Sequence, residues 1–190
     1  MRKLIYSMGT SLDGYIETRD GEIAMPEPDE ELHRFANEEA REMGAFLYGR
    51  RLYEVMAGYW PTADTNPSTP DVEIEFARIW KRTPKVVFSR TLEKVDANSR
   101  LVRDNVAEEI RKLKAEPGKN LGIGGANLAA SAMQHDLIDE FRILVHPFVL
   151  GGGKPFFPDL ANRIQLRLLE TRTFGSGVVY LRYERADAGR

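Results

Sequence analysis

The residues whose chemistry stands out most lie where three short apolar stretches of the chain end. They are glycines, arginines and small polar residues, in the runs Gly49-Arg50-Arg51, Ser89-Arg90 and Gly124-Gly125-Ala126-Asn127. Glycine lets the backbone approach a ligand closely, and a guanidinium group can bind phosphate through two hydrogen bonds. A helix that begins at such a turn adds free N–H groups and the positive end of its dipole. The three runs together predict a site for a ligand with several phosphates, and NADPH is the natural candidate.

Each run is a weak signal by itself. Judged by residue type alone, Arg50 and Arg51 are more simply explained as solvated surface charges. Residues 122–127 approach the Rossmann fingerprint, but they lack its third glycine, and Glu140 precedes the next strand where the ribose-binding acid should follow it. Residues 151–154 lack the spacing of a Walker A motif, so we interpret these glycines as a structural turn. It is the order of the three strand ends that favours a phosphate site.

The elements that must position these residues follow from the hydrophobic pattern. Short apolar runs predict buried strands at residues 3–9, 46–48, 85–88, 121–123 and 141–145. Helical patterns between them predict helices over residues 29–43, 71–80 and 104–113, and helices beginning at 52 and 126. Residues 164–168 and 178–183 alternate apolar and polar side chains, which predicts an antiparallel pair.

We therefore expect one three-layer α/β domain over residues 1–190, with a mostly parallel central sheet and an antiparallel C-terminal strand pair. In an open sheet of this kind ligands bind at the carboxyl ends of the strands, where the three runs would meet. Residues 10–28 have no helical period, so they are either a functional loop or a plain surface loop. Residues 58–70 are rich in Pro, Thr and Asn and are expected to form a loop.

Composition excludes several functional classes. The chain has 190 residues, 42% of them hydrophobic, and a net charge of -2, so charge gives no general reason to expect a nucleic acid or membrane partner. It has no cysteine, and His33, His135 and His146 are scattered, so we expect no metal site. No apolar run is long enough for a signal peptide or a membrane span, and a cytoplasmic location is expected.

Four runs form a further pattern along the chain. They are Ser11-Leu12-Asp13-Gly14-Tyr15-Ile16, Tyr48-Gly49-Arg50-Arg51-Leu52-Tyr53-Glu54, Gly124-Gly125-Ala126-Asn127-Leu128, and Leu137-Ile138-Asp139-Glu140 followed by His146-Pro147-Phe148-Val149-Leu150-Gly151. In these runs the chain resembles the dihydrofolate reductase-like superfamily, in particular its bacterial branch related to the C-terminal reductase domain of riboflavin biosynthesis. The resemblance covers nearly the whole chain and is more specific for fold and cofactor than for substrate.

The resemblance implies a dihydrofolate reductase-like fold and an NADPH-dependent reductase of a small heterocycle, most closely of the 5-amino-6-(ribosylamino)uracil type. It would place Gly49, Arg50 and Arg51 at the cofactor phosphates, and Ser89 and Arg90 at the adenosine ribose and its 2′-phosphate. Gly124 and Gly125, with Ala126 and Asn127, would form a turn beneath the pyrophosphate that can include a cis peptide bond. Residues 13–26 would be a mobile loop over the nicotinamide.

The chain also departs from true dihydrofolate reductases. Glu27 stands where they carry a tryptophan after the Met-Pro of that loop, and Arg82 is out of step with the arginine that binds the folate tail. The carboxylate that holds the pterin ring could be any of three acids of the first helix, namely Glu30, Glu31 and Glu38. A true dihydrofolate reductase and a non-catalytic NADP(H)-binding protein are therefore the alternatives.

Three residues are candidates for the chemical step. Glu31 and Asn37 are predicted to contact the substrate from the first helix, and Asp13 is predicted either to take part in catalysis or to order its loop. The expected partners are a small-molecule substrate and a second copy of the chain. The homodimer is predicted because the alternating C-terminal strands leave an apolar face or edge open to pairing.

Overall fold

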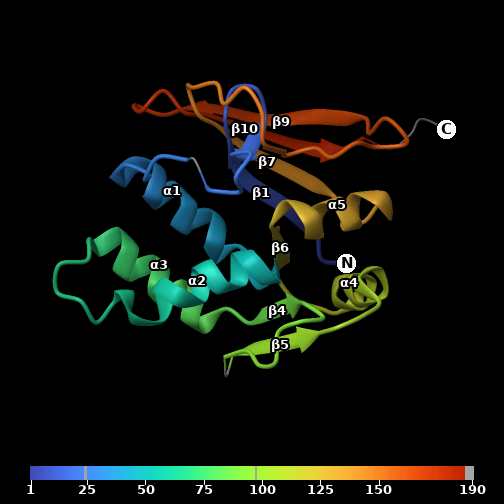
Figure 1. Ribbon diagram of the computed structural model, residues 1–190, viewed down its shortest axis with the longest axis horizontal. Helices are drawn as coiled ribbons and strands as arrows, with labels where there is room; N and C mark the ends of the chain where they lie inside the picture. The colour runs from blue at the N-terminus through green and yellow to red at the C-terminus, as the bar shows by residue number, and fades with distance from the viewer. Residues whose placement is uncertain (24, 97, 187–190) are drawn as a thin grey trace.

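An eight-stranded sheet in the order β5-β4-β3-β6-β1-β7-β10-β9 runs through the molecule (Figure 1). The computed structural model describes residues 1–23, 25–96 and 98–186. The strands are β1 (Leu4–Thr10), β3 (Met43–Gly49), β4 (Lys85–Phe88), β5 (Ser99–Val102), β6 (Asn120–Gly124), β7 (Glu140–Val145), β9 (Leu166–Thr173) and β10 (Val179–Arg185). Neighbours from β5 to β7 are parallel, whereas β10 is antiparallel to both β7 and β9. The predicted mostly parallel sheet with an antiparallel C-terminal pair is confirmed.

Helices cover both faces of this sheet. Helices α1 (Glu30–Arg41), α2 (Arg50–Ala63) and α3 (Asp71–Arg82) lie on one side, and α4 (Val106–Ala115) and α5 (Ala126–Gln134) lie on the other (Figure 1). The strands supply both layers because successive side chains point to opposite faces. In β1, Leu4 and Tyr6 pack in the core under α4 and α5, while Ile5 packs in the core under the other three helices.

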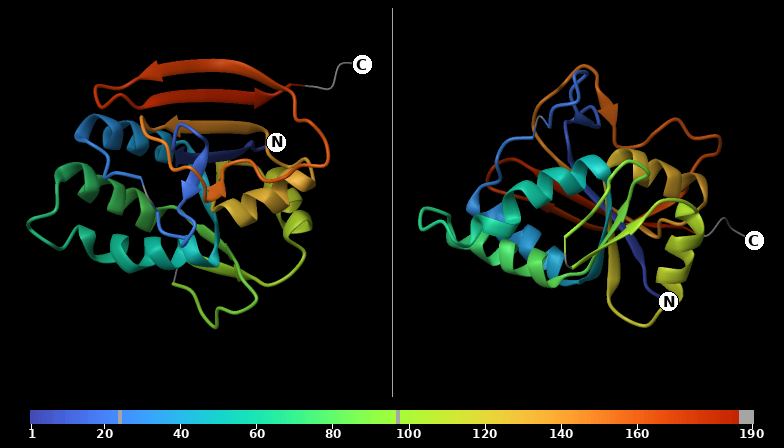
Figure 2. Two further views of the ribbon diagram at one scale, coloured as in Figure 1. Left: turned by 45° about the horizontal axis from the view of Figure 1, so that its top comes forward. Right: turned by 60° about the horizontal axis from the view of Figure 1, so that its bottom comes forward.

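The C-terminal hairpin extends the sheet beyond β7 and covers the start of α1 (Figure 2). Leu32 and Phe35 of α1 form a small core with residues of the hairpin. Phe35 meets the rings of Phe174 and Tyr180 edge to face, with ring centroids 5.1 and 4.7 Å apart. The hairpin thus supports the helix that faces the central strand β1.

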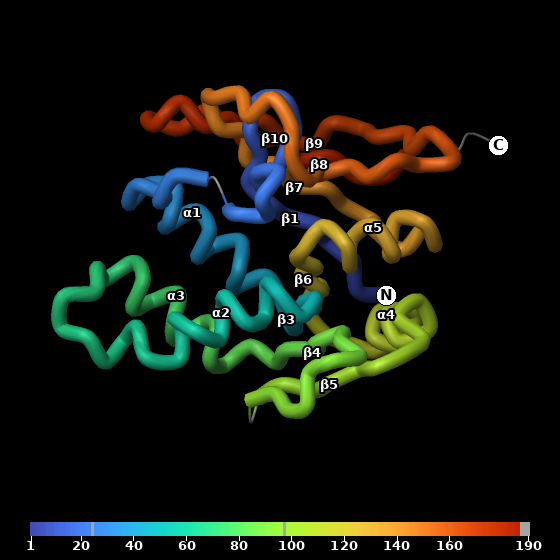
Figure 3. Tube along the Cα trace, in the orientation of Figure 1, coloured from blue at the N-terminus to red at the C-terminus, as the bar shows by residue number. Residues whose placement is uncertain are grey.

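A second, two-stranded sheet was not predicted. It pairs β2 (Tyr15–Glu17) with β8 (Lys154–Pro155), so the blue segment after β1 lies beside the orange segment that carries β8 (Figure 3). We call residues 11–23 the first loop and residues 151–153 the glycine turn. All three glycines of that turn have positive φ, which other residues rarely adopt. The glycine turn packs against the first loop, since a Cβ on Gly153 would overlap the backbone at Glu17.

The structure corrects the prediction of a loop over residues 58–70. Helix α2 continues through Pro61 and ends at Ala63. Pro61 costs the helix its own backbone hydrogen bond, but Trp60 packs on α3 with its ring 4.4 Å from that of Phe76. This tertiary packing outweighs the loop-forming composition. Strand β5 was also missed, because its four residues alternate too briefly to stand out.

No helix within the described residues is both long and apolar enough to cross a lipid bilayer.

Candidate functional site

The three predicted strand ends meet at one edge of the sheet. Strands β4, β3 and β6 are parallel neighbours, with Gly49 opposite Phe88 and Tyr48 opposite Gly124. Their carboxyl ends therefore lie side by side, and α2 and α5 begin there at Arg50 and Ala126. This parallel arrangement brings together residues that are far apart in the chain.

A cavity of about 720 Å³ opens at this edge. It is lined by five residues of the predicted cofactor set, Gly49, Arg50, Ser89, Arg90 and Asn127. Two further arginines that the sequence did not single out, Arg103 and Arg111, also line it. Four guanidinium groups around one cavity are suited to a phosphorylated ligand. We call it the arginine cavity.

The arginines of this cavity differ in how they are held. Arg90 forms an ion pair with Asp104 at 3.0 Å, and Arg103 donates to the carbonyl oxygen of Arg90 at 3.1 Å. Among the described residues, Arg50 and Arg111 form no ion pair within the chain. Those two guanidinium groups keep their donors for a ligand.

Ser89 has a defined local role. Its hydroxyl oxygen accepts hydrogen bonds from the backbone N–H groups of Thr91 and Leu92, at 3.2 and 3.0 Å. The hydroxyl therefore orders the turn after β4, which forms one wall of the arginine cavity.

A second cavity of about 540 Å³ adjoins the first, since Gly49, Arg50, Asn127 and Leu128 line both. Arg51, Gly125 and Ala126 from the predicted set line this one. Gly125 has φ +91° and directly precedes α5, so the free N–H groups of the first turn of the helix lie at this cavity. The resemblance allowed a cis peptide bond between Gly124 and Gly125, but the described residues contain none.

Arg51 lines the second cavity, but its guanidinium is already bound to groups of the first loop. Its guanidinium forms an ion pair with Glu17 at 3.1 Å and donates to the carbonyl oxygen of Gly21. The start of α2 is thereby tied to the first loop, whose residues Ile16 and Ile23 line this cavity.

A third cavity of about 270 Å³ lies between α1, α2 and the sheet and shares Met8 and Leu52 with the second. We call it the apolar cavity because most of its lining side chains are apolar. Gly124 of the predicted set lies on its floor, together with Gly122. All nine predicted cofactor residues thus line one of three adjoining cavities.

None of the three predicted catalytic residues, Asp13, Glu31 and Asn37, lines any of these cavities. Asp13 accepts hydrogen bonds from the Ser11 hydroxyl at 2.6 Å and from the N–H groups of Leu150 and Gly151 at 3.0 and 2.8 Å. These bonds, chiefly the one from Ser11, lower the pKa of Asp13. The geometry matches the alternative that Asp13 orders its loop.

Glu31 faces the C-terminal hairpin. Its carboxylate accepts from the N–H of Gly175 and from Arg172, both at 3.0 Å, and these two bonds lower its pKa. Asn37 is fully buried, and its amide donates to the carbonyl oxygen of Val72 at 2.9 Å and to Glu75 at 2.8 Å. Both residues link α1 to neighbouring elements, and their predicted contact with a substrate stays a prediction.

Sequence reasoning missed Glu39, whose side chain reaches the apolar cavity from α1. It lies one turn after Phe35 and Ala36, within the apolar stripe of the helix. A charged residue inside an apolar stripe is the signal that could have identified it. Burial raises the pKa of Glu39 although Arg142 beside it acts in the opposite direction.

Within the described chain no group of three or more His, Asp or Glu side chains is placed to hold a metal ion.

Comparison with known proteins adds to this geometry. The model of the family described as the RibD C-terminal domain matches residues 2–180. Uncharacterized protein YyaP of Bacillus subtilis (strain 168) is 38% identical over 185 residues, covering 96% of this chain and 94% of that protein. Uncharacterized protein YwjB of the same organism is 32% identical over 190 residues, covering 97% and 99%.

Two solved structures share the fold. A putative riboflavin biosynthesis protein from Shewanella sp. PV-4 superposes with a TM-score of 0.73 at 23% identity, over 97% of this chain and 99% of that chain. The diaminohydroxyphosphoribosylaminopyrimidine deaminase/5-amino-6-(5-phosphoribosylamino)uracil reductase of Thermotoga maritima gives 0.66 at 15% identity, over 97% of this chain and 57% of that chain.

Proposed function

Because this chain belongs to the RibD C-terminal domain family, within the dihydrofolate reductase-like superfamily, we propose that it is an NADPH-dependent reductase of a small heterocyclic substrate. One observation supports the proposal above the others. The nine residues expected to bind the cofactor line three adjoining cavities at the carboxyl edge of the parallel strands.

The residues present fit the charges of NADPH. Arg50 lines both the arginine cavity and the second cavity, so it is suited to the pyrophosphate together with the N–H groups at the start of α5. Arg90, Arg103 and Arg111 would then surround the 2′-phosphate in the arginine cavity. When bound, NADPH supplies a hydride to the substrate.

The apolar cavity adjoins the second cavity and would take the flat ring of the substrate. Ser7 lines this cavity and is exposed, so water, and with it the proton that completes a reduction, can reach the substrate there. An aminopyrimidine is the leading substrate class, since the Thermotoga maritima neighbour is named as a reductase of such a compound.

Titration with NADPH, followed by nucleotide fluorescence, tests the cofactor. Arg50→Ala should weaken binding about tenfold or more, because it removes a charge-assisted hydrogen bond to phosphate. Arg111→Ala should reduce the preference for NADPH over NADH, because only NADPH carries the 2′-phosphate. Arg78→Ala, on the exposed side of α3, is the matched control.

Two results would contradict the cofactor assignment. One is the absence of saturable NADPH binding below about 1 mM, the upper end of ordinary enzyme affinities. The other is an Arg50→Ala affinity equal to that of the Arg78→Ala control.

A non-catalytic NADP(H)-binding protein is the second candidate. The observation that favours it is the scarcity of acid–base groups at the apolar cavity, whose described lining includes only Glu39 and Tyr48 as ionisable side chains. Burial raises the pKa of Tyr48 far above its ordinary value. NADPH binding without NADPH consumption across aminopyrimidines, dihydrofolate, other pterins and quinones would support this candidate over the reductase.

A further inference from the structure

A fourth cavity opens at the edge of the sheet opposite to the three already described. Its volume is about 410 Å³, and it lies where β3, β4 and β5 begin and α4 ends. It shares no described lining residue with the other three cavities. We call it the amino-edge cavity, and we propose that it binds a small organic anion whose carboxylate or phosphate group is held by Arg2.

The guanidinium group of Arg2 is fixed at the wall of this cavity. Its side chain is only 9% exposed, and its Nε donates a hydrogen bond to the carbonyl oxygen of Lys119. A Cβ on Gly44 would come within 2.8 Å of Nη2, and one on Gly118 within 3.6 Å of Nε. Two glycines thus leave room for the guanidinium beside the backbone. A group held in this way loses little freedom when it binds a ligand.

Most hydrogen-bond donors of Arg2 are unused. A guanidinium carries five N–H donors, and within the described chain the Nη1 and Nη2 groups of Arg2 donate no hydrogen bond. The carboxylate of Glu116 lies 3.7 Å from Nη1, too far for a hydrogen bond, and that side chain is 59% exposed. Leaving charged donors unpaired away from water is costly. An anion in the cavity would accept from these donors.

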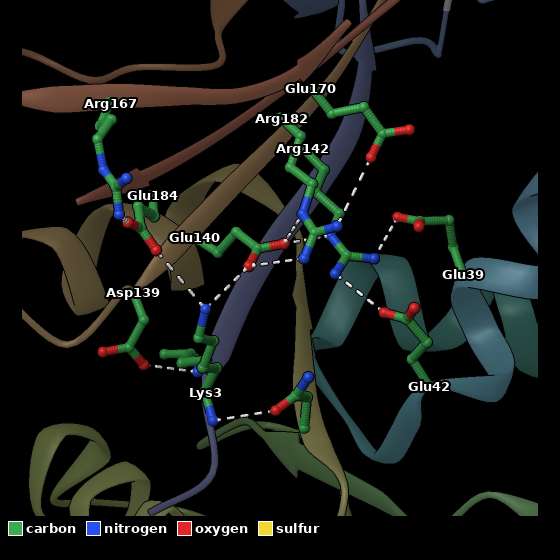
Figure 4. A network of polar contacts seen from close by, with 12 residues as sticks. Lys3, Glu39, Glu42, Asp139, Glu140, Arg142, Arg167, Glu170, Arg182 and Glu184 are labelled. Carbon is green, nitrogen blue, oxygen red and sulfur yellow. Dashed lines mark hydrogen bonds and ion pairs between the residues drawn. The ribbon is translucent and has the colours of Figure 1, made fainter. Parts of the chain in front are cut away.

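Arg142 shows how this protein pairs a buried arginine completely. Its Nε donates to Glu140 at 2.7 Å, and its two Nη groups donate to Glu39 and Glu42 (Figure 4). Three carboxylates therefore compensate for the burial of one guanidinium. Arg2 is buried almost as deeply, but one long ion pair is the only compensation that the described chain gives it. The missing negative charge is what a ligand would supply.

The other cationic groups at this cavity are already paired. Arg100 lines the cavity, but its guanidinium forms an ion pair with Glu109 of α4. Lys85 also lines it, but its ammonium donates to the carbonyl oxygen of Trp80 at 3.0 Å. Arg2 is therefore the group that would hold the anion.

The rest of the lining indicates what else the ligand carries. Buried Ala45, Val86 and Leu113 form an apolar part of the wall. The volume of about 410 Å³ lies within the 300–1,000 Å³ typical of sites for small organic ligands. These features suit an anionic group on a compact apolar body better than a bare inorganic ion.

The C-terminal end of α4 is the feature that opposes an anion here, because free carbonyl groups at a helix end carry partial negative charge. Two of these carbonyl oxygens are occupied, since that of Lys112 accepts from the N–H of Glu116 at 3.3 Å and that of Lys114 from the N–H of Arg2 at 2.9 Å. The exposed carboxylate of Glu116 remains, and it competes with a ligand for Arg2.

The test uses benzoate and phenyl phosphate as probes, because they carry the two oxyanions on the same ring. Phenol has the ring without the charged group and is the control. Binding is followed by the backbone amide signals of Gly44, Ala45 and Val86 in ¹H–¹⁵N NMR spectra, which report on the amino-edge cavity. Signals of Gly49 and Ser89 report separately on the arginine cavity. At least one anion should shift the first set saturably, and phenol should bind there at least about tenfold more weakly.

Two pairs of variants assign the binding to Arg2. Arg2→Gln should weaken binding of the anion at least about tenfold. Arg82→Gln, at the end of α3 and outside the cavity lining, should leave it unchanged. Glu116→Gln removes the competing carboxylate and should tighten binding about threefold. Glu30→Gln removes the same charge from another exposed ion pair and should not tighten it.

The results decide the inference without reference to NADPH, so it stands or falls apart from the reductase proposal. It is overturned if neither anion shifts the amino-edge signals, if phenol binds as tightly, or if Arg2→Gln binds as tightly as Arg82→Gln. If Arg2→Gln does not fold, the exposed position decides alone. Tighter binding by Glu116→Gln than by Glu30→Gln then supports the site, and equal binding refutes it.

Discussion

Replacing Gly153 with alanine should detach the first loop from the glycine turn. The residue has φ +138°, and an added Cβ would overlap the carbonyl oxygen of Glu17 and lie 3.0 and 3.2 Å from the carbonyl carbons of Glu17 and Thr18. These neighbours are backbone atoms, so no side-chain rotation can relieve the overlap. The pairing of β2 with β8 must therefore shift or break.

Gly151 provides a matched control in the same turn. It also has a positive φ, +72°, but a Cβ built there would meet nothing within 4 Å. Both substitutions incur the cost of an unfavourable backbone conformation, about 1–3 kcal/mol. Gly153→Ala adds the overlap and the lost strand pairing, for which we expect about 2 kcal/mol more.

Urea and thermal denaturation of the two variants measure this difference. About 2 kcal/mol corresponds to a melting temperature about 4–8 °C lower for a chain of this length. The shape of the second cavity should also change, because Glu17 and Lys154 line it. Gly153→Ala should therefore bind NADPH more weakly than Gly151→Ala. Equal stabilities, within about 0.5 kcal/mol, would show that the close packing of the glycine turn on the first loop is not what holds them together.

Two further predictions concern the ionic and loop contacts. Glu140→Gln should cost about 3–5 kcal/mol in urea denaturation, because Glu140 is fully buried and its loss leaves Arg142 short of a partner. Burial opposes the ionisation of Glu140, but its two bound arginines outweigh that effect and lower its pKa. The stabilisation that Glu140 provides is therefore present above pH 4.5 and is lost as the pH falls through the lowered pKa. A Glu140→Gln variant with the same acid unfolding transition as the wild type would contradict this. Asp13→Asn should speed hydrogen exchange at the amides of Leu150 and Gly151, and in the wild type this anchor should be lost only as the pH falls through the lowered pKa of Asp13. Exchange that stays slow in the variant would show that the carboxylate is not the anchor.

The fold was predictable where the pattern is simple. Residues 85–88 are apolar apart from one lysine and are buried throughout, as a central parallel strand requires. The end of α2 was not predictable in this way, because the packing of Trp60 on α3 decides it and local composition points to a loop. Pairing between β2 and β8 depends on residues far apart in the chain, which no local pattern reports.

The candidate site also has residues that could be placed from the sequence and residues that could not. Arg50 and Ser89 could be placed because the topology of a parallel sheet brings strand ends to one edge. Asn37 and Glu39 could not, since helical periodicity gives a face of α1 but not the neighbour that each side chain meets. Asn37 faces α3, whereas Glu39 faces the apolar cavity. The homodimer stays a prediction.

The central position of β1 has a consequence for how the chain folds during synthesis. Its partners are β6 and β7, and Leu4 lies opposite Leu121. At ribosomal rates of 5–20 residues per second, roughly 6–23 seconds separate the synthesis of these two residues. Throughout that interval the apolar strand Leu4–Tyr6 lacks both of its native partner strands, although it is synthesised before them.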